Sequence, residues 1–141
     1  MRFSVRGLII TAAAIVFAGA ATASAQVTDS ITNVPFAFTV GKTTLPGGSY
    51  RISRLSGQMA AFEISSTTRS AIVIGLPDRP DRKDDNARLV FHRYGDSYFL
   101  HEIVLPGDVA MSLPASRLEQ DAARKLASTT VPEVVVVATR R

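Results

Sequence analysis

The chain has 141 residues, a length that predicts one domain, and it contains no cysteine. Disulfides, cysteine zinc sites, iron–sulfur clusters and cysteine nucleophiles are therefore excluded. The formal net charge is +4, but Arg2, Arg6, Arg140 and Arg141 supply all of the excess. Because the rest of the chain is balanced in charge, the net charge gives no reason to expect the clustered basic surface of a nucleic-acid-binding protein. We predict no nucleic-acid partner.

Residues 1–25 have the three parts of a secretory signal peptide. Arg2 and Arg6 form a positive n-region, residues 8–18 form an apolar h-region, and residues 23–25 (Ala-Ser-Ala) fit the cleavage site. An uncleaved anchor is the alternative, because the apolar run extended to the end of this segment just reaches the length of a membrane span. Small and polar residues near its end favour cleavage.

Residues 26–141 are expected to form a single exported β domain, periplasmic or extracellular. No other apolar stretch is long enough to span a membrane, so we predict no transmembrane helix after cleavage. Since no disulfide can form, the domain must be stabilised by burial. A domain of this size buries roughly two-thirds of its unfolded surface, which suffices.

The first predicted strand covers residues 34–40, whose strict alternation places the even-numbered side chains on one buried face. The preceding residues 26–33 are polar and predict an irregular lead-in. Residues 45–48 (Leu-Pro-Gly-Gly) have Pro and then Gly at the centre, the pattern of a type II turn.

The remaining predicted strands are residues 49–55, 59–65, 70–76, 89–94, 97–105 and 131–138. A three-residue loop, residues 56–58, would pair Ile52 with Phe62 and set Arg51 opposite Glu63. That register gives one apolar face and one ion pair, so we prefer it.

Two apolar segments predict buried strands. Residues 70–76 are nearly all apolar and predict a central strand, and the four consecutive valines within residues 131–138 predict burial on both faces. Between the first of these and the hairpin, residues 77–87 predict a long polar loop.

Ser116 followed by Glu119 forms a capping box, which predicts a short helix from there to about Ala127. About seven strands at short spacing with one late helix predict a mainly β fold. The two architectures that fit are an antiparallel β-sandwich and a small β-barrel.

Several motifs resemble a group of small exported proteins of acidobacterial type. They are residues 33–41 (Asn-Val-Pro-Phe-Ala-Phe-Thr-Val-Gly), residues 45–52 (Leu-Pro-Gly-Gly-Ser-Tyr-Arg-Ile), residues 89–100 around His-Arg-Tyr-Gly-Asp, and residues 113–117. The resemblance covers most of residues 31–126. It implies a predominantly β exported protein and carries no activity or functional residues with it.

The two histidines are the strongest candidates for a functional site. With Gly95-Asp96 as a two-residue hairpin turn, His92 faces Phe99 and His101 faces Val90. Both histidines then lie on one face as diagonal neighbours, about 7–8 Å apart at Cα.

Such a pair could begin a metal site, but it lacks a third ligand because Glu102 alternates to the opposite face. The same register places Tyr94 and Phe99 on the histidine face, which is therefore rich in aromatic atoms. We predict that His92, Tyr94, Phe99 and His101 contact a ligand or partner, and we predict no metal and no cofactor.

No catalytic motif is found. Residues 101–105 begin like the zincin motif but end in Leu and predict a strand, and the chain has no phosphate loop or nucleophile elbow. We therefore predict an exported, non-enzymatic β domain that binds a partner protein, a glycan or a small apolar ligand in the cell envelope.

Two alternatives remain open. One is an envelope structural or assembly protein that acts through exposed strand edges, such as the first or last strand. The other is a metal-dependent enzyme that uses His92 and His101.

Overall fold

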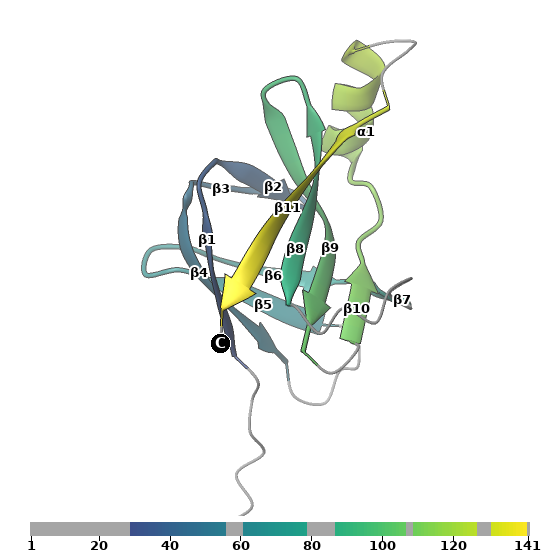
Figure 1. The fold of residues 1–141 in the computed structure, drawn as a ribbon. Helices are drawn as coiled ribbons and strands as arrows, with labels where there is room; N and C mark the ends of the chain where they lie inside the picture. Colours follow the sequence, from purple (N-terminus) through teal and green to yellow (C-terminus); the bar gives the residue numbers. More distant parts are fainter. Residues whose placement is uncertain (1–28, 56–60, 79–86, 107–108, 127–130, 141) are drawn as a thin grey trace, which may run out of the picture.

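The computed structural model describes residues 29–55, 61–78, 87–106, 109–126 and 131–140 (Figure 1). The expected signal peptide, residues 1–25, lies outside the described residues. The elements in chain order are β1 (Ser30–Val34), β2 (Phe38–Val40), β3 (Thr43–Leu45), β4 (Gly48–Arg54), β5 (Ala61–Ser65), β6 (Ser70–Ile74), β7 (Leu76–Asp78), β8 (Arg88–Tyr94), β9 (Ser97–Leu105), β10 (Val109–Ser112), α1 (Arg117–Lys125) and β11 (Glu133–Arg140).

The strands form one sheet that curls into a nearly closed barrel (Figure 1). Hydrogen-bonded neighbours follow the order β3-β2-β9-β8-β11-β1-β4-β5-β6. β7 continues β6 after Gly75 and pairs with β10, which also pairs with β9. The hydrogen-bonded path therefore returns to β9. The prediction of a mainly β fold with one short helix is confirmed, and of the two predicted architectures the chain has the small barrel.

The first predicted strand is two strands. β1 pairs with β4 and β11, whereas β2 pairs with β3 and β9, so the chain crosses the barrel at residues 35–37. Pro35 lies at this break, where its missing N–H costs no ladder hydrogen bond. The predicted buried face is largely retained, because Val34, Phe38 and Val40 are buried. The expected irregular lead-in is wrong from Ser30 onward, because these residues form β1.

The turn between β3 and β4 is not the predicted type II turn. Gly47 lacks the positive φ that this turn requires at its third residue. Its glycine is needed for another reason, since an added Cβ would lie 3.2 Å from the backbone nitrogen of Phe36. The turn is therefore packed tightly against the break between β1 and β2.

The predicted register between β4 and β5 is wrong by two residues. Ile52 pairs with Ile64 and Arg54 with Phe62, and the backbone N–H of Leu55 donates to Ala61 O at 3.0 Å. An even shift keeps the same side chains on the buried face, so the apolar pattern could not exclude it. The expected loop, residues 56–58, lies outside the described residues.

This register also does not bring together the expected ion pair of Arg51 and Glu63. Arg51 lies opposite Ser65 rather than Glu63. Its Nε lies 3.8 Å from Oδ2 of Asp29, just before β1, so its charge is balanced from the other neighbouring strand.

β6 is an edge strand, which corrects the prediction that residues 70–76 form a central strand. Ala71 and Val73 face the core, whereas the side chains of Ile72 and Ile74 are 67% and 69% exposed. The segment is apolar on both of its faces, but only the face with Ala71 and Val73 is covered. The predicted polar loop of residues 77–87 is shortened by β7, and its residues 79–86 lie outside the described residues.

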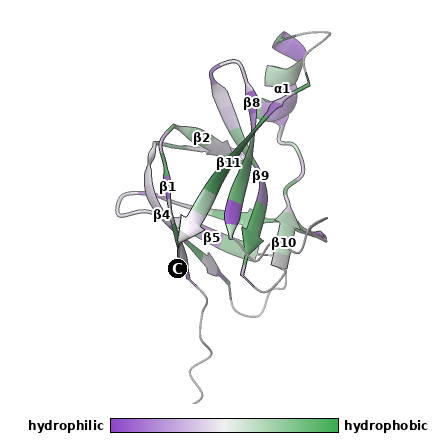
Figure 2. Cartoon of the chain, viewed as in Figure 1, coloured by the Kyte–Doolittle hydropathy of each residue, from purple (hydrophilic) through white to green (hydrophobic). Residues whose placement is uncertain are grey.

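β11 closes the barrel between β8 and β1 and is largely hydrophobic (Figure 2). Val135 and Val137 pack against the core, but Val134 and Val136 are exposed. Burial on both faces is therefore wrong. The hydroxyl of Thr32 in β1 donates to the carbonyl of Ala138 at 3.2 Å and adds a side-chain bond to this closure.

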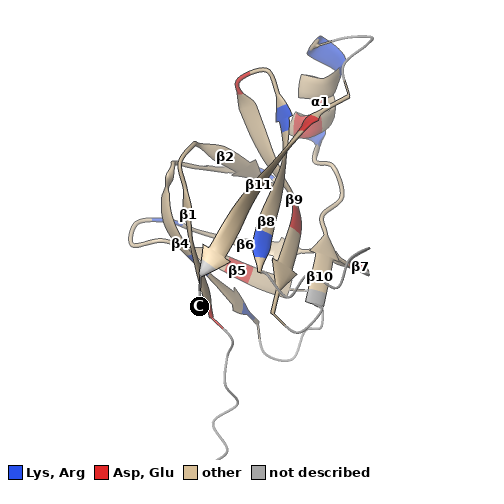
Figure 3. Ribbon diagram, in the orientation of Figure 1, with Lys and Arg blue, Asp and Glu red and all other residues tan. Residues whose placement is uncertain are grey.

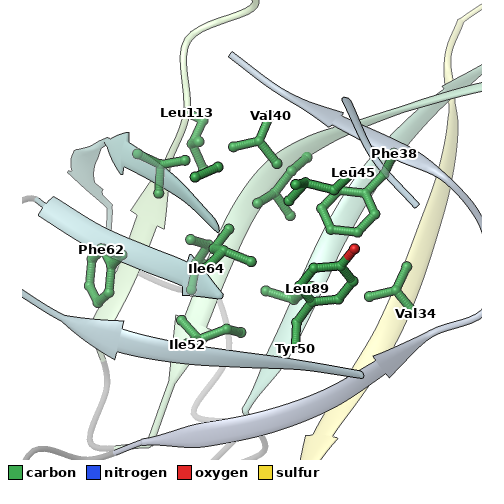
Figure 4. Close-up of a cluster of buried hydrophobic side chains, with 14 of the residues drawn as sticks. Val34, Phe38, Val40, Leu45, Tyr50, Ile52, Phe62, Ile64, Leu89 and Leu113 are labelled. Atoms are coloured by element: carbon green, nitrogen blue, oxygen red, sulfur yellow. The ribbon is translucent and has the colours of Figure 1, made fainter. Parts of the chain in front are cut away.

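The core fills the barrel with aromatic and branched side chains (Figure 4). Tyr50 is fully buried, and its hydroxyl donates a 2.5 Å hydrogen bond to the carbonyl of Pro46. Phe38 packs edge-on against Tyr50 and Phe91 with ring centroids 5.2 and 5.3 Å apart. A buried hydroxyl requires such a partner, so this bond fixes the turn before β4 to the core.

Helix α1 begins and ends close to the predicted positions. The Ser116 side chain caps it by accepting a hydrogen bond from the backbone N–H of Glu119 at 3.2 Å, and Leu126 is the C-cap residue. Among the described residues, no helix is long and apolar enough to cross a membrane.

Candidate binding site between helix α1 and the barrel

The β8–β9 hairpin has the predicted two-residue turn. Tyr94 pairs with Ser97 and His92 with Phe99, so the register near the turn is confirmed. Gly95 has a φ of 61°, the left-handed conformation that a tight hairpin turn requires at this position.

The register changes farther from the turn, at a β-bulge. Phe91 pairs with Leu100, but Val90 pairs with Glu102, so His101 is the extra residue and does not face Val90 as predicted. Two residues thus separate the core residues Leu100 and Ile103, and the inward-facing side of β9 changes from even to odd numbers. Glu102 follows His101 in the bulge and does not simply alternate to the opposite face.

His92 and His101 lie side by side on the outward side of the hairpin, and their rings stack. The ring centroids are 3.8 Å apart and the planes are inclined by 19°. Tyr94 contacts the His92 ring edge-on at 6.4 Å, and Phe99 contacts Tyr94 at 5.9 Å. The structure therefore brings together all four residues of the predicted site.

Glu119 of α1 reaches this group from the helix. Its side chain is almost fully buried, and Oε1 lies 3.0 Å from Nδ1 of His92. Because an ionised carboxylate only accepts hydrogen bonds, this contact holds a proton on Nδ1 of His92. A buried carboxylate needs such a partner, so the pair ties the first turn of α1 to β8.

Tyr94 is the second residue that responds to Glu119. Its pKa is raised above the usual tyrosine value, chiefly by burial, and further by the charge of Glu119 and a hydrogen bond to its carboxylate. The phenol therefore stays protonated as a donor. Glu119 thus binds two side chains of β8 at once.

His101 is held in its neutral form. Burial lowers its pKa most, the neighbouring His92 lowers it further, and the charges of Glu119, Glu102 and Asp78 oppose these effects. Its Nδ1 is buried and has no hydrogen-bond partner within the described part of the chain.

The stacked arrangement does not suit a metal held between the histidines. Lone pairs of imidazole nitrogens lie in the ring plane, and those of two nearly parallel rings with centroids 3.8 Å apart do not converge on one ion. Among the described residues, no group of three His, Asp or Glu side chains is placed to hold a metal.

Two adjoining hollows lie along α1, and we call them together the α1 groove. The first, of about 330 Å³, lies between the β2–β3 turn, the end of β6 and residues 113–119. The second, of about 400 Å³, lies between the β8–β9 turn and the helix. Both are lined by Thr39, Phe99 and Leu118, so they meet at these side chains.

The helix leaves apolar side chains uncovered along this groove. Leu118 is 48% exposed and Leu126 is 43% exposed, although both line the second hollow together with Ala122. This spacing of four residues places the three on one helix face. The groove is thus bounded by an apolar stripe of α1 on one side and by Phe99 on the other.

Charged residues are sparse on the strands and recur along α1 (Figure 3). Lys42 in the β2–β3 turn and Arg117 at the start of α1 both line the first hollow. Glu119 lines it too, but its carboxylate is buried against His92.

Of the predicted site residues, Tyr94 and Phe99 line the groove. His92 and His101 do not, and they are linked to it through Glu119. Sequence reasoning assigned Glu119 to a capping box, in which its side chain would return to the N-cap residue. No pattern in the sequence around Glu119 indicated that its side chain would instead contact His92 on β8.

No protein-family model, curated protein or solved structure matches the chain. The resemblance to small exported proteins of acidobacterial type therefore stays a prediction.

Proposed function

We propose that the protein is an exported, non-enzymatic β domain of the cell envelope that binds a small apolar ligand in the α1 groove. The observation that carries this proposal is the half-exposed stripe of Leu118 and Leu126 facing a hollow that ends at Phe99. Apolar hollows of a few hundred Å³ with few polar groups are typical of small-molecule sites. A ligand that covers the exposed leucines beside such a hollow removes apolar surface from water, which lowers the free energy of the complex.

The polar group behind the groove supports binding rather than catalysis. The carboxylate of Glu119 is bonded to His92 and Tyr94, and the His101 ring is stacked against His92. These contacts join the side chains of Glu119, His92 and Tyr94 to one another and fix the first turn of α1. Their role in the proposal is to hold one wall of the groove in place.

The test is native mass spectrometry of the protein purified without a tag from the envelope fraction of its own host. An added mass of a few hundred daltons that organic solvent removes is the expected result. The variant Leu118→Gln should lose this mass. Ile72→Gln is the matched control, because Ile72 is also exposed but does not line the groove.

A bare monomer in the wild type, and no uptake of aliphatic probes by the stripped protein, would refute a ligand site in the groove. Equal loss of the added mass in Leu118→Gln and Ile72→Gln would place the ligand elsewhere.

Assembly is the second candidate function, and one observation favours it. Ile72, Ile74 and Leu76 form an exposed apolar row along β6 and β7, beside the unpaired edge of β6. The edges named from the sequence, the first and last strands, are both paired on two sides and are not available. If β6 assembles copies, Ile72→Lys with Ile74→Lys should reduce the mass measured by light scattering to that of one chain. A wild-type protein that is already monomeric at high concentration would exclude this function.

A further inference from the structure

We infer that the ligand of the α1 groove is an aliphatic chain that ends in a single anionic group. This inference rests on the proposed function and adds the chemical class of the ligand. It is carried by two cationic side chains that line the apolar first hollow.

The two cations come from separate parts of the fold. Lys42 lies in the β2–β3 turn next to Gly41, whose φ of 59° sets the direction of that turn. Arg117 is the first residue of α1. Within the described ranges neither forms an ion pair, yet both line the same hollow of about 330 Å³. An anion placed between them would meet positive charge from two directions.

The acidic group of this hollow does not cancel that charge. Among the described residues that line it, Glu119 is the only carboxylate. It is 3% exposed, and its Oε1 is engaged by Nδ1 of His92. The negative charge is thus held behind the hollow and bonded there, whereas the long side chains of Lys42 and Arg117 can reach its open side.

The rest of the first hollow requires an apolar ligand body. Its walls include Val73 and Ile74 of β6, Phe99 of β9, Leu113 before the helix, and Leu118 of α1. The hollow continues past Phe99 and Leu118 into the second one, where Ala122 and Leu126 follow. A flexible chain can lie along this path, whereas a branched sugar would leave its hydroxyl groups facing leucine side chains without partners.

The sign of the ligand's charge follows from the same residues. A cationic amphiphile would place its head group beside Lys42 and Arg117, and like charges repel. A neutral chain would gain the apolar contacts alone. The expected order of affinity is anionic, then neutral, then cationic, and the difference between anionic and neutral chains should shrink as salt is added.

The experiment measures binding of decanoate, decanol and decyltrimethylammonium, each below its micelle concentration, by titration calorimetry. The protein is purified from the envelope fraction of cells that express the full-length chain, and its native ligand is removed with organic solvent. The three probes share one chain length and differ in head-group charge.

The wild type should bind decanoate about tenfold more tightly than decanol. The double variant Lys42→Gln/Arg117→Gln should bind the two equally, with decanol affinity unchanged. Arg124→Gln is the matched control, because it removes a cation from the same helix outside the α1 groove and should keep the preference.

Equal affinity of the wild type for all three probes would overturn the anionic head group and leave the apolar groove intact. Binding of decanoate alone that persists in Leu118→Gln would show association at a surface cation and would also overturn the inference. No binding of any probe would refute both the head group and the proposed function. Loss of selectivity in Arg124→Gln as well would show that only the overall charge matters.

Discussion

Glu119 on α1 and His92 on β8 meet at 3.0 Å across a separation of 27 residues in the chain. Together with the hydrogen bond from Tyr94, this contact joins the helix to the hairpin through Glu119, the only buried residue of α1. The position of the helix, and with it the shape of the groove, therefore depends on a pair of titratable side chains.

Glu119→Ala should detach the helix from the hairpin and lower the free energy of unfolding by about 2 kcal/mol, because a buried charge-assisted hydrogen bond is lost. Hydrogen exchange should become fast along α1 while the strands stay protected. Asp121→Ala, in the next turn and half-exposed, is the control and should change little. Equal protection of α1 in both variants would show that the helix is held by something other than Glu119.

The free energy of unfolding should fall as the pH drops below about 6.5, the ordinary pKa of histidine. The pKa of His101 is lowered by burial and by His92, so the unfolded chain binds a proton that the folded chain resists. The stability that His101 contributes is thus complete above 6.5 and is lost toward its lowered pKa. Urea unfolding between pH 5 and 7.5 measures the slope.

His101→Phe keeps a ring stacked on His92 and removes the titrating nitrogen, so its unfolding free energy should depend less on pH over the same range. A wild-type protein that becomes more stable as the pH falls would contradict the lowered pKa of His101.

Tyr50→Phe should lower the free energy of unfolding by about 1 to 2 kcal/mol, since the carbonyl of Pro46 loses its buried donor. Guanidinium unfolding followed by circular dichroism gives this value. Tyr98→Phe is the matched control, because Tyr98 is only partly buried and packs through its ring on Phe36 at 3.9 Å. A loss as large in Tyr98→Phe would show that removal of a tyrosine hydroxyl destabilises the fold without the bond to Pro46.

Removal of residues 131–141 should unfold the barrel rather than only abolish association. β11 pairs with β8 on one side and β1 on the other, so its loss opens both neighbours. The truncated chain should lose its cooperative thermal transition in circular dichroism. A truncated protein with an intact transition would mean that the other strands close a barrel without β11.

The strands were predictable where the pattern was local. The alternation around Phe38 predicted the buried face, and the Gly95-Asp96 turn predicted the pairing near the β8–β9 turn, because side-chain period and turn chemistry act over a few residues. The register of Ile52 was not predictable. A shift of two residues keeps the same side chains on the buried face, so only the loop between β4 and β5 decides the register.

Burial of apolar runs was misjudged for a related reason. Ile72 and Val134 lie in segments that are apolar on both faces, and such segments are read as central strands. Whether a second layer covers them depends on the whole topology. In this barrel nothing among the described residues covers them.

The site was predictable in part. The hairpin register placed His92, Tyr94 and Phe99 on one face, which the structure has. The bulge at His101 and the contact of Glu119 with His92 were not predictable, because both depend on how the helix packs against the barrel. The capping signal at Ser116 placed the helix but said nothing of the strand that it would meet.

The seam between β1 and β11 joins the first and last parts of the described fold, and Thr32 bonds to Ala138 across 106 residues of chain. A ribosome must release nearly the whole polypeptide before this seam can form. Until then β1 and β8 each have an unpaired edge where β11 will bind. The contacts between residues far apart in the sequence are the slowest to form. A nascent chain that still lacks β11 therefore cannot complete the barrel, which would suit the export in an unfolded state that we propose.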